Sequence, residues 1–121
     1  MFTTILVPFD GSEIAEQALP FAQDLAMRYD SKLTLLRALR PINISNAYTP
    51  SYDFIQEEEA FALEFAKEYL ENLAIGIQND GIEVTTAVSR GTTAREILKF
   101  ADQNVVDLIV MTARGQSVLT K

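Results

Sequence analysis

The chain has 121 residues, of which 48% are hydrophobic, and it carries a formal net charge of −7. It has no cysteine and no histidine, which excludes disulfides, thiolate metal sites and Ser-His or Cys-His nucleophilic catalysis. The negative charge argues against a broad nucleic-acid or anionic-membrane surface, and no apolar run approaches the ~18 residues of a membrane span. We therefore expect a single cytoplasmic domain over residues 1–121, with neither nucleic acid nor membrane as partner.

A short strand and a helix are predicted at the start of the chain. Residues 3–8 predict the strand, which runs into Asp10-Gly11-Ser12. Residues 12–29 predict the helix, with Ser12 as its N-cap. Pro20 should bend this helix, and one kinked helix or two separate helices would fit the pattern. The apolar face of the helix comprises Ala15, Ala18, Leu19, Ala22, Leu25, Ala26 and Tyr29.

The middle of the chain predicts a second strand, a long loop and a long helix. Residues 33–39 predict the strand, residues 40–52 the loop and residues 53–79 the helix. One face of the helix is apolar and carries Phe61, Phe65, Tyr69 and Leu73. The other face is acidic, either because it is solvated or because it docks a partner, and carries Glu57, Glu58, Glu59, Glu64, Glu68 and Glu71.

The last third of the chain predicts strand, helix and strand again. Residues 82–88 alternate as an edge strand does, and residues 107–112 form a continuous apolar strand. The helix between them opens at Gly91-Thr92-Thr93, where Thr93 and Glu96 have capping-box spacing. Its predicted buried stripe is Ala94, Ile97, Leu98, Ala101 and Val105. The alternation of strands and helices predicts an α/β fold with three layers, an open parallel sheet between helices.

Polar, glycine-containing turns follow the first and last predicted strands. Such turns form the ligand crevice of an open parallel sheet, at the point where neighbouring strands send their connections to opposite faces. If these two strands are neighbours, Asp10 could accept a hydrogen bond from a ribose hydroxyl or an amine. Gly11 and Ser12 could meet an anion at the helix start, and Gly115 allows a phosphate to approach the backbone. An ordinary capped turn would also explain Asp10-Gly11-Ser12.

Charge placement and missing motifs limit the chemistry. Four of the six arginines lie at or just past the ends of predicted strands, which suits a phosphate-bearing ligand but also fits ordinary polar loops: Arg37, Arg40, Arg90 and Arg114. Asp10 is the only carboxylate that we place in the crevice, so no acid/base pair is visible there. The sequence has neither a P-loop motif nor the dinucleotide-binding glycine motif. We therefore assign no catalytic residue and no metal ligand.

Three stretches resemble the universal stress protein family. Residues 5–12, followed by a helix with Ala18 and Ala22, resemble its opening, and residues 33–38 resemble its second strand. Residues 88–111 resemble the family's Gly-x-Pro…Ile…Ala…Asp-Leu-Ile-Val-Met-Gly run, with Thr93 in place of the proline. The resemblance covers the whole chain at the family's spacing.

This resemblance implies an adenine-nucleotide-binding regulatory protein of the stress response, with strand order 3-2-1-4-5 and a homodimeric assembly. Nucleotide contacts carry over to Asp10 with Pro8 beside it, to the backbone at Ala38, and to Met111. ATP, alone or with Mg²⁺, is the expected ligand, and the resemblance implies at most weak ATP hydrolysis. The candidate site comprises Pro8, Asp10, Gly11, Ser12, Ala38, Met111, Thr112, Arg114 and Gly115.

The family's phosphate loop, Gly-x2-Gly-x9-Gly-Ser/Thr, is matched only in part. Thr112 stands at its first glycine and Gly115 at its second, and the third would fall beyond Lys121. Either truncation of a longer protein or a natural short form would explain this. We therefore expect a sheet of order 3-2-1-4 without the family's fifth strand, ATP binding that is weak or lost, and a homodimer that covers the open edge of strand four. The alternative function is a nucleotide-independent dimerisation or interaction module of the same fold.

Overall fold

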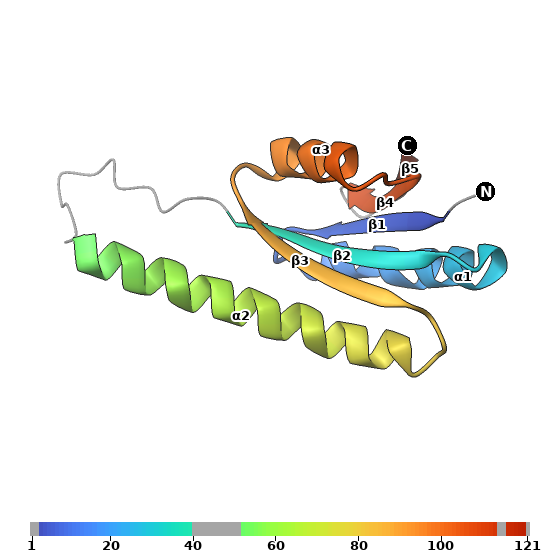
Figure 1. Cartoon of the computed structure of the whole chain (residues 1–121), viewed down its shortest axis with the longest axis horizontal. Coiled ribbons are helices and arrows are strands. Elements are labelled where there is room, and N and C mark those ends of the chain that lie inside the picture. The colour runs from blue at the N-terminus through green and yellow to red at the C-terminus, as the bar shows by residue number, and fades with distance from the viewer. Residues whose placement is uncertain (1–2, 40–51, 114–115, 121) are drawn as a thin grey trace.

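A computed structural model describes residues 3–39, 52–113 and 116–120, and the side chains of residues 3–39 and 56–112. Figure 1 shows the chain as a sheet with helices above and below it. No helix among these residues is long and apolar enough to cross a membrane. The elements in chain order are β1 (Thr4–Phe9), the 3-10 helix η1 (Ile14–Ala18), α1 (Leu19–Tyr29), β2 (Lys32–Leu39), α2 (Tyr52–Gln78), β3 (Val84–Arg90), α3 (Thr93–Gln103), β4 (Leu108–Ala113) and β5 (Gln116–Thr120).

The sheet has the order β3-β2-β1-β4-β5. Its first four strands are parallel, which confirms the predicted order 3-2-1-4. In the register, Ile5 of β1 lies opposite Leu33 of β2 on one side and Leu108 of β4 on the other. Residues 5–9 of β1 are buried without interruption, as expected for a central strand covered on both faces.

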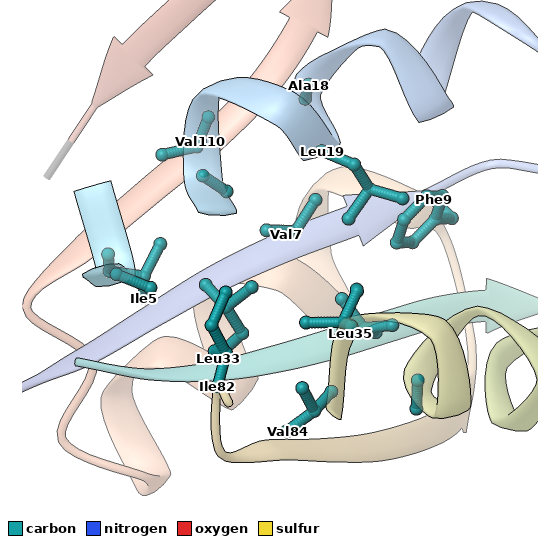
Figure 2. Close-up of a cluster of buried hydrophobic side chains, with 14 of the residues drawn as sticks. Ile5, Val7, Phe9, Ala18, Leu19, Leu33, Leu35, Ile82, Val84 and Val110 are labelled. Carbon is teal, nitrogen blue, oxygen red and sulfur yellow. The ribbon is translucent and has the colours of Figure 1, made fainter. Parts of the chain in front are cut away.

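Helices cover both faces of the sheet and give two core clusters. The larger cluster packs β1 and β2 against α1 and α2, and Figure 2 shows Val7, Phe9 and Leu35 within it. The smaller cluster packs Leu6 and Leu36 against Ile97 of α3. Successive side chains of a strand point to opposite faces, so β1 contributes alternately to the two clusters. The predicted three-layer architecture is confirmed.

The outer edge of β4 is not open, and this part of the sequence analysis is wrong. The chain turns back after β4, and β5 pairs with it in antiparallel orientation, with Ile109 opposite Thr120 and Ala113 opposite Gln116. An apolar edge strand is a template for aggregation, and here a segment of the same chain covers it. In the described part of the chain, the outermost strands are therefore β3 and β5.

The predicted helix over residues 12–29 begins later and has two parts. A 3-10 helix over Ile14–Ala18 leads directly into α1, and the backbone at Ala18 and Leu19 stays right-handed helical. Pro20 therefore lies in the first turn of α1, where its missing N–H removes no intrahelical hydrogen bond. Ser12 is not the N-cap: Glu13 takes that position, and the Ser12 hydroxyl donates to Asp10 instead.

The start of α3 also departs from the sequence prediction. Thr92, not Thr93, is the N-cap, and no side chain caps the helix. Glu96 is buried and packs against Gly91, where a β-carbon would collide with its carboxylate. The predicted stripe is wrong in part, because Leu98 and Val105 are 67% and 79% exposed. Ile97 is buried as expected, and Phe100 packs beside it.

Only the second half of the apolar face of α2 is buried. Ala66 and Leu70 are buried, whereas Phe61 and Phe65 are 72% and 67% exposed. A helix of 27 residues is about 40 Å long at the usual rise per residue, whereas an eight-residue strand spans about 26 Å. The first turns of α2 therefore project beyond the carboxyl ends of the strands (Figure 1).

Candidate functional site

Two adjoining cavities lie at the carboxyl ends of β1, β2 and β4, and we call them together the α3-side crevice. One has a volume of about 570 Å³ and is lined by Asp10, Arg37, Ala38, Leu39 and Thr93. The other is small, about 40 Å³, and is lined by Pro8, Phe9, Asp10, Ala15, Thr93, Ile97, Met111 and Thr112. Asp10 and Thr93 line both cavities.

The crevice brings together five of the residues predicted from the sequence: Pro8, Asp10, Ala38, Met111 and Thr112. Gly11 lines a different cavity, which lies beside α2. Ser12 lines neither part of the crevice and acts through its hydrogen bonds to Asp10. Arg114 and Gly115 lie outside the described residues.

The Asp10 carboxylate is held by the turn that follows it. Its Oδ1 accepts hydrogen bonds from the Ser12 hydroxyl at 2.6 Å and from the Ser12 backbone N–H at 2.9 Å. These two hydrogen bonds, helped by the positive charge of Arg37, hold the pKa of Asp10 below its ordinary value of 3.8. Asp10 is therefore ionised at neutral pH and offers only acceptors to a ligand.

The end of β4 is fixed to the start of the first helical segment. The Thr112 hydroxyl donates to the Ile14 carbonyl at 3.0 Å. Met111 is half-buried and packs on the smaller core cluster beneath the crevice. Thr112, which occupies the position of a family glycine, thus has a structural role that a glycine could not perform.

The arginines do not gather around Asp10. Arg37 lies on the rim of the crevice, where its Nη1 donates to the Ala38 carbonyl at 3.1 Å. Arg90 forms an ion pair with Glu59 of α2, with 3.4 Å between Nη1 and Oε2. Arg40 and Arg114 lie outside the described residues. The described arginines therefore offer one cation, Arg37, to a ligand in the crevice.

Sequence reasoning misses Thr93, Leu39 and Ile97 as residues that line the crevice. Thr93 carried a signal, because it stands where the family motif has proline. Ile97 looked like a core residue, and it is one, with an edge at the crevice. No group of three or more acidic side chains in the described part of the chain could hold a metal ion.

Comparison with known proteins identifies the family. A sequence model of the universal stress protein family matches residues 1–121. The chain belongs to this family. The universal stress protein YxiE of Bacillus subtilis is 31% identical to it over 125 residues, which cover 98% of this chain and 84% of YxiE.

Solved structures of universal stress proteins share this fold. MJ0577 of Methanocaldococcus jannaschii superposes with a TM-score of 0.80 at 28% identity, covering 96% of this chain and 78% of that one. Two more distant structures contain adenine nucleotides. One is a universal stress protein in complex with cAMP, with 19% identity, a TM-score of 0.63, and coverage of 91% of this chain and 72% of that one. The other is an Arabidopsis thaliana family member with AMP bound, with 20% identity, a TM-score of 0.61, and coverage of 93% and 77%.

Proposed function

We propose that this universal stress protein binds an adenine nucleotide, ATP, in the α3-side crevice and acts as a regulatory protein of the stress response. The observation that carries the proposal is the convergence of Asp10, Ala38 and Met111, from three different strand ends, on one crevice. In open α/β sheets, ligands bind outside the carboxyl ends of the strands, where the connections diverge to opposite faces. Here α1 follows β1 on one face, and α3 leads into β4 from the other.

Each part of a nucleotide has a suitable counterpart in this crevice. The ionised Asp10 carboxylate accepts hydrogen bonds from ribose hydroxyl groups. The base lies against Ala38 and Leu39, where backbone polar groups at the end of β2 meet its edge. Met111 and Ile97 supply the apolar floor. The phosphates extend past Thr112 toward the turn after β4.

The ligand class is chosen on two further grounds. The cAMP- and AMP-bound relatives share the fold, although they are too distant to assign contacts to individual residues here. The cavity of about 570 Å³ falls within the usual range of roughly 300–1,000 Å³ for small-molecule sites. An adenine nucleotide agrees with the ligands of these relatives and with the volume of the cavity.

Calorimetric titration with ATP, AMP and GTP tests the proposal. We expect ATP and AMP to bind and GTP to bind more weakly. Asp10→Ala should weaken ATP binding by about 10-fold or more, since a hydrogen bond to a charged group is lost. The matched control is Asp24→Ala, which removes an exposed carboxylate of α1 that pairs with Arg28 and should leave ATP affinity unchanged.

Two results would overturn the proposal. One is the absence of heat with any adenine nucleotide at millimolar concentration, with the chain shown to be folded by circular dichroism. The other is an ATP affinity that falls equally in Asp10→Ala and Asp24→Ala. In the second case ATP binds somewhere else on the chain.

One observation favours the alternative, a nucleotide-independent interaction module. Thr112 stands at the first glycine of the family's phosphate loop, and its hydroxyl is engaged with Ile14. Thr112→Gly distinguishes the two functions. If the crevice is a nucleotide site, this change should alter ATP affinity. If the protein is an interaction module, the change should alter only stability, and ATP should not bind before or after it.

We also propose that the protein is a cytoplasmic homodimer whose contact includes β5. This strand is the outer edge of the sheet on the β4 side, and its outer backbone groups can pair with a second copy around a two-fold axis. The exposed glutamates of α2 should stay outside the contact, because like charges would meet there. Light scattering measures the mass directly, and a monomer at high protein concentration would contradict this assembly.

A further inference from the structure

A second cavity, which we call the α2-side cavity, lies beside α2 and shares Arg37 and Leu39 with the α3-side crevice. It has a volume of about 410 Å³ and is lined by Gly11, Arg37, Leu39, Phe61, Ala62, Phe65, Ala66 and Tyr69. Arg37 follows Leu33 and Leu35 at every second position of β2, and both leucines belong to the core beneath α1 and α2. Strand alternation therefore directs the Arg37 side chain to the α2 side.

The walls of this cavity are apolar, and two of their aromatic side chains are exposed to solvent. Phe61 and Phe65 are one turn apart on α2, and their side chains remain 72% and 67% exposed. They lie in the first half of α2, the helix whose first turns project beyond the strand ends (Figure 1). Ala62 and Ala66 fill little space between them. Adjacent exposed aromatic rings beside a cavity mark a binding surface more often than a solvated one.

Tyr69 forms the floor of the cavity and is held by two neighbours, Phe9 and Glu16. The Tyr69 ring packs edge-on against Phe9, with 6.3 Å between ring centroids and 80° between ring planes. Its hydroxyl donates to Glu16. Burial, reinforced by this hydrogen bond, raises the pKa of Tyr69 above its ordinary value of 10.0. Tyr69 therefore keeps its proton, and its hydroxyl already has an acceptor.

The remaining polar group is a positioned cation. Arg37 donates from Nη1 to the Ala38 carbonyl at 3.1 Å and lies close against Gly11. That hydrogen bond uses one of the five guanidinium N–H donors. A planar guanidinium held in this way recognises a carboxylate through two parallel hydrogen bonds.

We propose that the α2-side cavity binds amphipathic monocarboxylates, with the carboxylate on Arg37 and an aliphatic or aromatic body against Phe61, Phe65 and Leu39. A second copy of the chain fits this surface less well. Glu57, Glu58, Glu64 and Glu68 are exposed on the same helix, and a two-fold contact between α2 helices would bring them close to one another. A small ligand that carries one negative charge to Arg37 avoids this repulsion.

The test uses the whole chain and a fluorescent amphipathic anion, 1-anilinonaphthalene-8-sulfonate. We expect saturable binding, and we expect decanoate to displace the probe at about 10-fold lower concentration than 1-decanol does. Arg37→Met should abolish the preference for decanoate, and Arg37→Lys should retain part of it, because the charge remains without the bidentate geometry. Circular dichroism confirms that each variant is folded.

A matched pair of aromatic variants locates the probe. Phe65→Ser should weaken probe binding by about 10-fold, because the bound probe loses its contact with an aromatic ring. Phe21→Ser removes a phenylalanine that is 51% exposed on α1 and does not line the cavity, and it should leave the affinity unchanged. Equal affinity of the two variants would overturn the proposal, as would equal displacement by decanoate and 1-decanol. A dimer that dissociates in Phe65→Ser would also overturn it and would assign the surface to a contact between copies.

Discussion

The Arg37 guanidinium occupies the space next to Gly11 that a side chain would need. A β-carbon at Gly11 would lie 2.7 Å from Nη2 of Arg37, and Gly11 has φ of +92°. Glycine at position 11 leaves this space to Arg37, whereas another residue would be strained at this φ and would make the guanidinium shift. Gly11 lines the α2-side cavity, whereas Arg37 lines both this cavity and the α3-side crevice and therefore lies where the two sites meet.

Gly11→Ala should lower the free energy of unfolding by about 1–2 kcal/mol, because alanine is strained at positive φ and Arg37 must move. Urea denaturation measures the change. Gly76→Ala is the control: it lies within α2 with nothing near its position for a β-carbon, so alanine should stabilise the helix by about 0.5–1 kcal/mol. A Gly11→Ala protein as stable as the wild type would show that this turn relaxes freely.

Ser12→Ala should raise the pKa of Asp10 toward 3.8, because the hydroxyl hydrogen bond is the largest cause of its lowered value. The pKa should remain somewhat below 3.8, since the Ser12 backbone N–H still donates. A carboxyl group with a lowered pKa in the folded state contributes stability above the unfolded pKa, and this stability is lost as pH falls through the folded pKa. Carbon-13 NMR below pH 5 measures the titration curve of the Asp10 carboxyl in the wild type and in Ser12→Ala. Identical titration curves would show that the Ser12 hydroxyl does not lower the pKa of Asp10.

Tyr69→Phe should destabilise the protein by about 1 kcal/mol at pH 7, since it removes one hydrogen bond between α2 and η1. The pKa of Tyr69 is raised in the folded state. Its contribution is therefore fully present below its unfolded pKa near 10.0 and is lost as pH rises through the folded value. The stability difference between wild type and Tyr69→Phe should accordingly shrink in strongly alkaline solution. A difference that stays constant from pH 7 to the alkaline unfolding limit would contradict this.

Asp107→Ala should lower the free energy of unfolding by about 1–3 kcal/mol. The Asp107 Oδ2 accepts hydrogen bonds from the backbone N–H groups of Thr3 and Thr4, both at 2.9 Å, and so joins the starts of β1 and β4. Asp107→Asn keeps an acceptor oxygen and should fall between wild type and alanine. Asp102→Ala serves as the control, because removing a carboxylate from the last turn of α3 should be neutral or slightly stabilising. Thermal unfolding of the wild type and of the three variants measures this order of stability.

The order of the four parallel strands could be predicted from patterns that are local in sequence and from a family resemblance that covers the whole chain. Continuous apolar runs such as Leu108–Met111 are typical of strands covered on both faces. The strand-end argument placed Asp10 in the crevice, because the carboxyl ends of parallel strands meet at one edge of the sheet. The family resemblance added Ala38 and Met111. Element boundaries agree with the structure to within about two residues, which is the usual uncertainty of helix and strand ends.

Tertiary structure decided which of these residues share a cavity and which side chains stay exposed. Phe61 and Phe65 follow the same four-residue spacing as Tyr69, yet only Tyr69 meets the sheet, because α2 is longer than the strands it covers. The partners of Ser12 and Arg37 depended on loop geometry and on strand alternation across the whole sheet. The antiparallel β5 depended on the exposed edge of β4, a property of the assembled sheet. Local sequence therefore determined where helices and parallel strands form and which of their residues are apolar. The relative lengths of the packed elements and the edges of the sheet determined the sites.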